Sequence, residues 1–255
     1  MKTRAAVLHE MGAKKPYKES KPLKIEYLEL DNPSEHEVLI KIHAAGLCHS
    51  DLSVINGNRP RPLPMALGHE ASGEVIKVGK AVTRVSEGDH VVCTFIPSCG
   101  KCIPCKEGRP ALCENGAISN EKGEMLEGGV RLSNDEGKVY HHLGISGFAE
   151  YSVVSENSIV KIDKKIPFER AAAFGCAIIT GIGAVVNTAQ IRSGSNVAVV
   201  GLGGIGLNAI IGAKLAGANE IIALDINEDK FELAKQFGAT ATFNSSDKDI
   251  DEQIK

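Results

Sequence analysis

Residues 196–206 read NVAVVGLGGIG, an apolar run that leads directly into a Gly-x-Gly-x-x-Gly motif. The apolar run is typical of a parallel strand buried on both faces, and residues 205–216 have the apolar spacing of a helix. A second apolar run, residues 220–225, ends in an acid, Asp225, nineteen residues beyond Gly206. A strand, a glycine turn, a helix and an acidic strand end form the context in which this motif binds a dinucleotide.

The glycines and the acid of this motif have separate expected roles. Gly201 makes the tight turn, Gly203 lets the backbone approach a pyrophosphate, and Gly206 lets the helix pack closely on the strand. Asp225 would accept hydrogen bonds from a ribose diol and repel a 2′-phosphate, and no Arg follows it. We therefore predict NAD rather than NADP as the cofactor. The alternatives are a plain strand–turn–helix corner and a domain for a different nucleotide.

The surrounding segments extend this pattern into a doubly wound α/β domain. Residues 168–190 are small and apolar and predict mostly helix, residues 229–237 predict a second helix after the motif, and residues 239–243 predict a third strand. A complete domain of this kind has about six parallel strands, of which this sequence supplies about three. We therefore expect the domain at 168–255 to be incomplete, with a helix starting near residue 247.

The residues before this domain are rich in short β segments. Residues 38–44, 73–79, 90–93 and 150–154 are rich in β-branched residues and are bounded by turn residues. Short strands at this density predict a barrel or a sandwich. We place the domain boundary at residue 167, at the end of the charged stretch 161–167.

Residues 99–113 read CGKCIPCKEGRPALC, which places four cysteines within fifteen residues. Four thiolates at this spacing can bind one tetrahedral Zn²⁺ with no open position, which predicts a structural zinc. Disulfides or free thiols are the alternatives, but the N-terminus lacks the apolar core of a signal peptide. We therefore predict a cytoplasmic protein that keeps its thiols reduced.

Composition limits the partners. The net charge of −3 gives no basic surface for nucleic acid or for an anionic membrane. No stretch approaches the roughly 20 apolar residues of a membrane-spanning helix. The 43% hydrophobic content is enough for a packed core in one large domain or two smaller ones.

Cys48, His69 and Cys176 could form a second metal site. Two Cys and one His leave a fourth position open on zinc, as catalytic sites require. A single cysteine, however, is more often a small buried apolar residue, and a single histidine is more often a core residue with its hydrogen bonds made. Their separation of 21 and 107 residues in the sequence does not by itself assemble them.

The sequence resembles the zinc-dependent medium-chain alcohol dehydrogenases from Ala5 to about Lys255. The resemblance rests on residues 46–51 (GLCHSD), 68–70 (GHE), the cysteine lobe, 175–176 (GC), the glycine motif and Asp225. It implies a GroES-like β-barrel catalytic domain at 1–167, with a zinc lobe at about 97–115, followed by a Rossmann domain at 168–255. In such proteins roughly another hundred residues follow, so we expect a fragment.

The resemblance implies NAD and two zinc ions per chain. Cys48, His69 and Cys176 would hold a catalytic zinc, and Cys99, Cys102, Cys105 and Cys113 a structural one. Catalytic roles fall to Ser50, which takes the alcohol proton, Asp51, which orients His69, and Glu70, which lies behind the zinc. Cofactor contacts fall to His49, Thr180, Ile205 and Lys230, and Phe95 would form an apolar wall of the substrate pocket. As alternatives, Ser50 could be a helix N-cap with Asp51 complementing the helix dipole. Thr180 and Ile205 could pack helices, Glu70 could be a solvated charge, and Lys230 could be a surface charge.

The implied activity is the reversible, NAD-dependent oxidation of primary or secondary alcohols to aldehydes or ketones by zinc-assisted hydride transfer. The full-length protein would form homodimers or homotetramers. A polyol or amino-alcohol dehydrogenase and an inactive, zinc-stabilised nucleotide-binding fragment are alternatives. A zinc-free quinone reductase is a further alternative, which the two complete ligand sets disfavour.

Two departures from the family pattern bear on mechanism. Ser53 stands where many relatives have a His that passes the proton onward, so the proton exit differs. Ala117 stands where the glutathione-dependent formaldehyde dehydrogenases have an Arg, and Arg59 and Arg61 lie where those enzymes have acidic residues. We therefore expect no dependence on glutathione.

Overall fold

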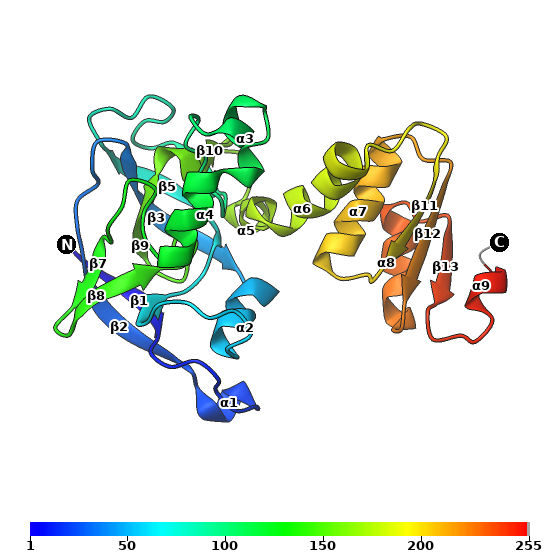
Figure 1. Ribbon diagram of the computed structural model, residues 1–255, viewed down its shortest axis with the longest axis horizontal. Helices are drawn as coiled ribbons and strands as arrows, with labels where there is room; N and C mark the ends of the chain where they lie inside the picture. Colours follow the sequence, from blue (N-terminus) through cyan, green and yellow to red (C-terminus); the bar gives the residue numbers. More distant parts are fainter. Residues whose placement is uncertain (254–255) are drawn as a thin grey trace. The chain divides into compact units, whose positions relative to one another are not determined.

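The computed structural model describes residues 1–253, without the side chains of Asp251 and Gln253. The chain divides into two compact units, the first spanning Met1–Gly175 and the second beginning at Cys176. Figure 1 shows the elements of both units along the chain. Each unit is described by itself.

The first unit is built from two groups of strands. One is a closed barrel in the order β1 (Lys2–Leu8), β2 (Leu23–Leu30), β7 (Leu132–Asn134), β8 (Gly137–His141) and β4 (Met65–Ala66). The other is a five-stranded sheet in the order β10 (Ile159–Lys161), β6 (His90–Cys93), β5 (Glu70–Val78), β3 (Glu37–Gly46) and β9 (Tyr151–Ser155). All four predicted strands lie in this sheet, and the barrel prediction is confirmed.

Short helices flank these strands, and the apolar clusters of the unit include one in the barrel, one against the sheet and one around Leu8 and Met65. The helices are α1 (Tyr17–Ser20), α2 (His49–Ile55), α3 (Ile103–Lys106), η1 (Pro110–Leu112), α4 (Glu114–Lys122), η2 (Glu156–Ser158), α5 (Phe168–Ala172) and η3 (Ala173–Gly175). The barrel cluster lies around Leu28 and Val139, and the sheet cluster lies around Ile40 and Val91. Side chains of Val, Ile, Leu and Ala dominate both clusters, as a chain without Trp requires.

The first unit continues past residue 167, where the sequence placed the boundary. The ring of Phe168 stacks on His43 and lies tilted against His90, with ring centroids 4.4 Å apart in both pairs. The Ser72 hydroxyl donates to the Phe168 carbonyl at 2.6 Å. These contacts attach α5 to the five-stranded sheet, so the compact unit ends after η3 at Gly175.

The second unit is a three-stranded parallel sheet with helices. The strands run in the order β11 (Asn196–Val200), β12 (Glu220–Asp225) and β13 (Ala241–Asn244). The helical segments are α6 (Ala177–Gly183), η4 (Ala184–Ala189), α7 (Gly204–Leu215), η5 (Glu228–Lys230), α8 (Phe231–Phe237) and α9 (Ile250–Gln253). The alternation of strands and helices predicted for this half is confirmed. The predicted helix at 229–237 is divided into the 3₁₀ turn η5 and the helix α8. The predicted last helix begins at Ile250, and residue 254 lies outside the described residues.

The prediction that β11 is buried on both faces is wrong. Val199 is buried and packs with Ile210 and Ala213 of α7. Val200 points away from this cluster and is 76% exposed. The apolar composition of the strand therefore overstates its burial in this unit.

No single helix of the described residues is long and apolar enough to cross a membrane. The bent pair Phe168–Gly175 and Ala177–Ala189 passes only when its two helices are combined, and by length and composition alone.

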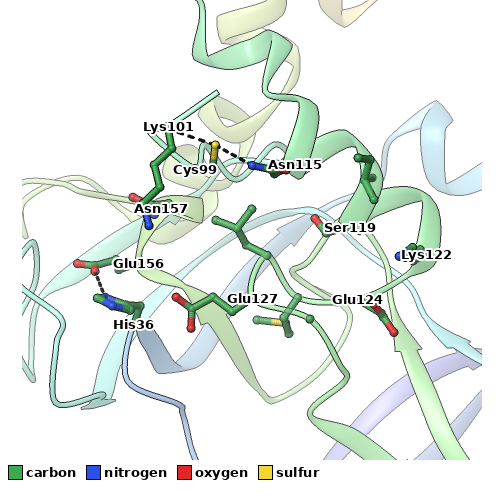
Figure 2. A pocket seen from close by; sticks show the side chains of 14 residues that line it. His36, Cys99, Lys101, Asn115, Ser119, Lys122, Glu124, Glu127, Glu156 and Asn157 are labelled. Carbon is green, nitrogen blue, oxygen red and sulfur yellow. Dashed lines mark hydrogen bonds and ion pairs between the residues drawn. The ribbon is translucent and has the colours of Figure 1, made fainter. Parts of the chain in front are cut away.

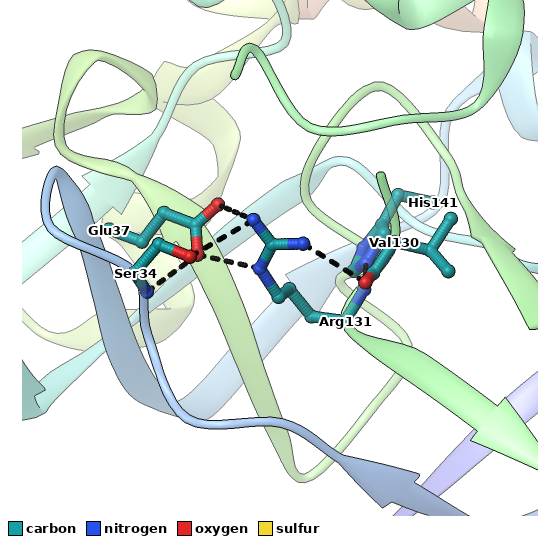
Figure 3. A network of polar contacts seen from close by, with 5 residues as sticks. All are labelled: Ser34, Glu37, Val130, Arg131 and His141. Atoms are coloured by element: carbon teal, nitrogen blue, oxygen red, sulfur yellow. Dashed lines mark hydrogen bonds and ion pairs between the residues drawn. The ribbon is translucent and has the colours of Figure 1, made fainter. Parts of the chain in front are cut away.

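A buried ion pair ties the barrel to β3 (Figure 3). Arg131 donates from Nε and Nη2 to the two Glu37 carboxylate oxygens, each at 2.8 Å. The Glu37 side chain is 2% exposed and that of Arg131 is 15% exposed. The Arg131 backbone N–H also donates to His141 Nε2 at 3.0 Å, so Arg131 contacts both Glu37 of β3 and His141 of β8.

Replacing Arg131 with Met should destabilise the first unit by about 3–5 kcal/mol, because it leaves the Glu37 carboxylate buried without its partner. All four tyrosines of the chain lie in this unit and Trp is absent, so tyrosine fluorescence during urea unfolding measures its stability. Lys2→Met is the control, since the Lys2–Glu29 pair is exposed and contributes at most about 1 kcal/mol. Equal, small effects of both variants would contradict this assignment.

Candidate functional site

The four cysteines of residues 99–113 converge on one point. Their sulfur atoms all lie within 4.8 Å of one another, and Cys102 Sγ lies 3.9 Å from Cys113 Sγ. A tetrahedral zinc with bonds of about 2.3 Å separates its sulfurs by about 3.8 Å. None of these four cysteines forms a disulfide, which removes the disulfide alternative.

Backbone N–H groups are aimed at the sulfurs of this lobe. Lys101 and Cys102 donate to Cys99 Sγ at 3.4 Å each, and these bonds lower the pKa of the Cys99 thiol to about 6. Desolvation, with neighbouring Cys102, raises the pKa of the Cys105 thiol to about 12. Four crowded sulfurs resist becoming thiolates together unless a cation neutralises them, so the donor set fits a divalent metal.

A cavity of about 510 Å³ opens beside the lobe (Figure 2). Its lining includes Cys99 and Asn115, whose amide Nδ2 lies 3.2 Å from Cys99 Sγ. His36 and Glu156 line the other side and contact each other at 3.2 Å. Cys99 is thus the cysteine of the lobe that lines this cavity among the described residues.

A second cluster of ligand atoms lies at the start of α2 and β5. Cys48 directly precedes α2, His69 lies between β4 and β5, and Glu70 begins β5. The ligand atoms of these three residues lie within 4.8 Å of one another. His69 Nε2 is buried and meets hydrogen-bond geometry with none of the residues that the structure describes, which fits a nitrogen that binds a metal.

Asp51 holds this cluster together. Its Oδ2 accepts from the Cys48 backbone N–H at 3.2 Å, and its Oδ1 accepts from the Gly68 N–H at 3.0 Å. The same Oδ1 lies 3.2 Å from His69 Nδ1. The carboxylate therefore closes the first turn of α2 and also orients His69, so its capping role and its orienting role coexist.

Asp51 and His69 each stabilise the charged form of the other. Burial opposes the charged forms, but hydrogen bonds from two histidines hold the pKa of Asp51 well below its usual range. Burial also acts to lower the pKa of His69, yet Asp51 and Cys48 outweigh it and raise that pKa to about 9. A cation at Nε2 would take the place of the proton that this environment favours.

His142 is a buried contact of Asp51 that the sequence analysis missed. Its Nδ1 lies 2.9 Å from Asp51 Oδ1, and its ring meets the His69 ring edge-on with centroids 5.3 Å apart. Its position follows from the pairing of β4 with β8, and no motif spacing marks it in the sequence.

Two further predicted residues lie beside His69. The Phe95 ring meets the His69 ring edge-on at a centroid distance of 6.2 Å. Glu70 is buried, and a Cβ at Gly46 would come 2.3 Å from Glu70 Oε2. The prediction that Glu70 could be a solvated charge is therefore wrong.

The remaining catalytic candidates in the first unit lie on α2. Ser50 is half-buried in its first turn, while His49 is exposed. Cys48, and not Ser50, occupies the N-cap position, so the N-cap alternative for Ser50 is wrong. Ser53 Oγ donates to the His49 carbonyl at 2.9 Å and lies 3.3 Å from His49 Nδ1.

In the second unit, Cys176 is buried at the N-cap position of α6, where its side chain makes no capping hydrogen bond with the described residues, and Thr180 lies within that helix. Cys176 follows Gly175 directly. A Cβ at Gly175 would come 2.1 Å from the Cys93 carbonyl, so the residue bonded to Cys176 is packed tightly against β6.

The glycine motif has the geometry that its roles require. Gly201 has a φ of +90°, which suits a tight turn that other residues rarely adopt. A Cβ at Gly206 would come 1.8 Å from the Gly201 carbonyl oxygen, whereas a Cβ at Gly203 would meet no atom within 4 Å. Gly206 is thus needed for packing, and Gly203 faces open space. Ile205 is 52% exposed beside it.

Asp225 lies at the end of β12 and anchors the glycine loop. Its carboxylate accepts from the backbone N–H of Leu202 at 2.6 Å and of Asn227 at 2.9 Å. Lys230 Nζ lies 2.9 Å from Asp225 Oδ2. Lys230, followed by the two N–H groups, lowers the pKa of Asp225 to about 2, so the group is a carboxylate at neutral pH.

Comparison with known proteins yields two family matches. The family model "Alcohol dehydrogenase GroES-like domain" matches residues 34–164, and the model "Zinc-binding dehydrogenase" matches residues 204–255. The chain is 45% identical over 250 residues to the S-(hydroxymethyl)glutathione dehydrogenase of Synechocystis sp.. It is 47% identical over 228 residues to the alcohol dehydrogenase class-3 of Drosophila melanogaster.

Solved structures agree with these matches. An alcohol dehydrogenase zinc-binding domain protein from Burkholderia ambifaria superposes with a TM-score of 0.91 at 38% identity, covering 100% of this chain and 67% of its own. Benzyl alcohol dehydrogenase from Acinetobacter calcoaceticus gives 0.89 at 38% identity with the same coverage. The curated relatives are matched over 98% and 89% of this chain, which spans 66% and 60% of their lengths.

Proposed function

This chain belongs to the zinc-dependent medium-chain alcohol dehydrogenase family, and we propose that it catalyses the reversible, NAD-dependent oxidation of primary or secondary alcohols to aldehydes or ketones. The observation that carries the proposal is the arrangement of His69. Asp51 Oδ1 lies 3.2 Å from its Nδ1, and its buried Nε2, which meets hydrogen-bond geometry with none of the described residues, lies in the cluster of ligand atoms with Cys48. A metal-ligating histidine is held in this way by a carboxylate.

We assign Cys48, His69 and Cys176 to a catalytic zinc and the four cysteines of the lobe to a structural zinc. Cys176 directly follows Gly175, which packs closely against the Cys93 carbonyl. This packing of the preceding residue supports the place of Cys176 in the ligand set. When bound, zinc would polarise the alcohol oxygen and lower its pKa.

The side chains of this chain supply the remaining parts of the reaction. Asp51 fixes the ring of His69, and the Ser50 hydroxyl on the first turn of α2 takes the alcohol proton. Phe95, edge-on to His69, provides an apolar wall for the substrate. The Ser53 hydroxyl donates its hydrogen bond to the His49 carbonyl. We therefore expect water or the cofactor ribose, and not Ser53, to carry the proton away.

The cofactor is assigned to the glycine motif. The open space at Gly203 admits a pyrophosphate, and the Asp225 carboxylate accepts hydrogen bonds from the ribose diol. His49, Thr180, Ile205 and Lys230 are assigned as further contacts. We place the protein in the cytoplasm, as a homodimer or homotetramer, and expect neither nucleic acid nor a membrane as a partner.

The test is NADH formation at 340 nm with a panel of simple alcohols, polyols and amino alcohols, each with NAD and with NADP. Turnover of simple alcohols with NAD supports the proposal. Activity confined to polyols or amino alcohols favours that alternative. Binding of NAD without turnover of any alcohol identifies an inactive nucleotide-binding module and contradicts the proposal.

The name of the Synechocystis relative contains a second substrate, S-(hydroxymethyl)glutathione, which the residues of this chain disfavour. Ala117 offers no positive charge to a glutathione carboxylate, and Arg59 and Arg61 stand in the loop before Gly68, where the glutathione-dependent relatives have acidic residues. We therefore expect formaldehyde oxidation to be unchanged by added glutathione. Benzyl alcohol oxidation in the same buffer is the control for general effects of the thiol, and a large gain confined to formaldehyde would contradict this prediction.

A further inference from the structure

The fold places His142 beside His69 by strand pairing alone. Strands β4 and β8 run parallel, with Ala66 opposite His141. The residues that follow each strand therefore lie next to each other, and the His142 N–H donates to the Ala66 carbonyl at 3.2 Å. Its own carbonyl accepts from Ile145 and Ser146 at 3.1 and 3.2 Å, so the backbone is fixed on both sides.

The side chain of His142 reaches the carboxylate that orients His69. Asp51 Oδ1 is approached by the Gly68 N–H at 3.0 Å, by His69 Nδ1 at 3.2 Å and by His142 Nδ1 at 2.9 Å. His142 is 1% exposed. Among the described residues neither of its ring nitrogens has a partner that meets hydrogen-bond geometry, so the contact of Nδ1 with Asp51 Oδ1 is one of ion-pair distance.

A buried imidazole in this position lowers the stability of the fold unless its contacts compensate for the cost of burying it. A polar ring that is buried without its full set of hydrogen bonds is unfavourable relative to an apolar side chain of similar size. The adjacent His141 shows the contrast, because both of its ring nitrogens have partners, Arg131 N and Ser146 Oγ. The Asp51 carboxylate is the acidic group that His142 Nδ1 faces, at 2.9 Å.

We propose that His142 is a positioning residue that holds Asp51 in place, and that Asp51 in turn keeps His69 with Nε2 presented to the metal. This inference rests on the proposed function, because it assigns a role toward the catalytic zinc. His142 itself touches neither the substrate nor the metal.

The test compares two substitutions of His142. His142→Leu removes the ring nitrogen that lies 2.9 Å from Asp51 Oδ1, and His142→Asn keeps an amide nitrogen at about the position of Nδ1. Zinc retained per chain is measured by plasma mass spectrometry after equilibration with a graded series of chelator concentrations. We expect His142→Leu to lower the affinity for one of the two zinc ions about 10- to 100-fold. His142→Asn should retain most of that affinity.

His141→Leu is the matched control, because it removes a neighbouring buried histidine that does not contact Asp51. It should lower the unfolding midpoint, followed by tyrosine fluorescence, and leave both zinc affinities unchanged. The proposal fails if His142→Leu keeps the wild-type affinity, or if His142→Asn loses zinc as readily as His142→Leu. A wild-type protein that binds only the lobe zinc would instead overturn the proposed function, and the inference with it.

Discussion

Replacing His69 with Ala should remove one of two zinc ions per chain and lower alcohol turnover about 1,000-fold or more. His69 Nε2 is the buried nitrogen of the assigned ligand set, and Ala leaves its position without a donor. A zinc Lewis acid contributes several kcal/mol to the transition state, and each 1.36 kcal/mol is a factor of ten in rate. Zinc content and the rate of NADH formation measure the two effects.

His36→Ala is the control for this variant, because His36 is a histidine of the same unit whose side chain is 46% exposed beside Glu156. It should keep both zinc ions and full activity. The assignment of the site is contradicted if His69→Ala retains two zinc ions, or if it loses one without a loss of turnover. Tyrosine fluorescence should show that the variant remains folded.

Replacing Asp225 with Ala should abolish the preference for NAD. In the cofactor complex the carboxylate is assigned to the ribose diol, and a hydrogen bond to a charged group contributes about 1.5–3 kcal/mol. Loss of two such bonds lowers kcat/KM with NAD by about 100-fold or more. The substitution also releases Lys230, which lies 2.9 Å from the carboxylate. Lys230 can then pair with a 2′-phosphate, so kcat/KM with NADP should rise.

The readout for Asp225 is the ratio of kcat/KM with NAD to that with NADP. Asp229→Ala is the matched control, since it removes an exposed acid next to Lys230 and should leave the ratio unchanged. A ratio in Asp225→Ala equal to that of the wild type would contradict the assigned ribose contact. Equal loss with both cofactors would mean that Asp225 acts only through the Leu202 N–H that it anchors.

Local features of the sequence predicted the second unit well. The segment 220–225 became β12 with the same bounds, and the positive φ of Gly201 and the close packing of Gly206 follow from the motif itself. The error at β11 has a physical cause: composition reports what a strand can bury, whereas Val200 lies on a face where the described unit gives it little cover.

The metal and positioning residues of the first unit were harder to predict. Cys48 and His69 lie 21 residues apart, and only the resemblance to a family joined them. His142 was missed because its role depends on the register of β4 and β8, which pairs segments far apart in sequence. The compact unit extends past the predicted boundary at residue 167 because Phe168 packs against His43 and His90, and no local pattern shows such a long-range contact.

The zinc content of protein purified without added metal tests the central claim most directly. Plasma mass spectrometry should find two zinc ions per chain, one of which is lost in Cys102→Ser and the other in His69→Ala. One zinc per chain, lost in Cys102→Ser and retained in His69→Ala, would mean that the lobe alone binds metal, and it would contradict the assignment of a catalytic zinc to this chain.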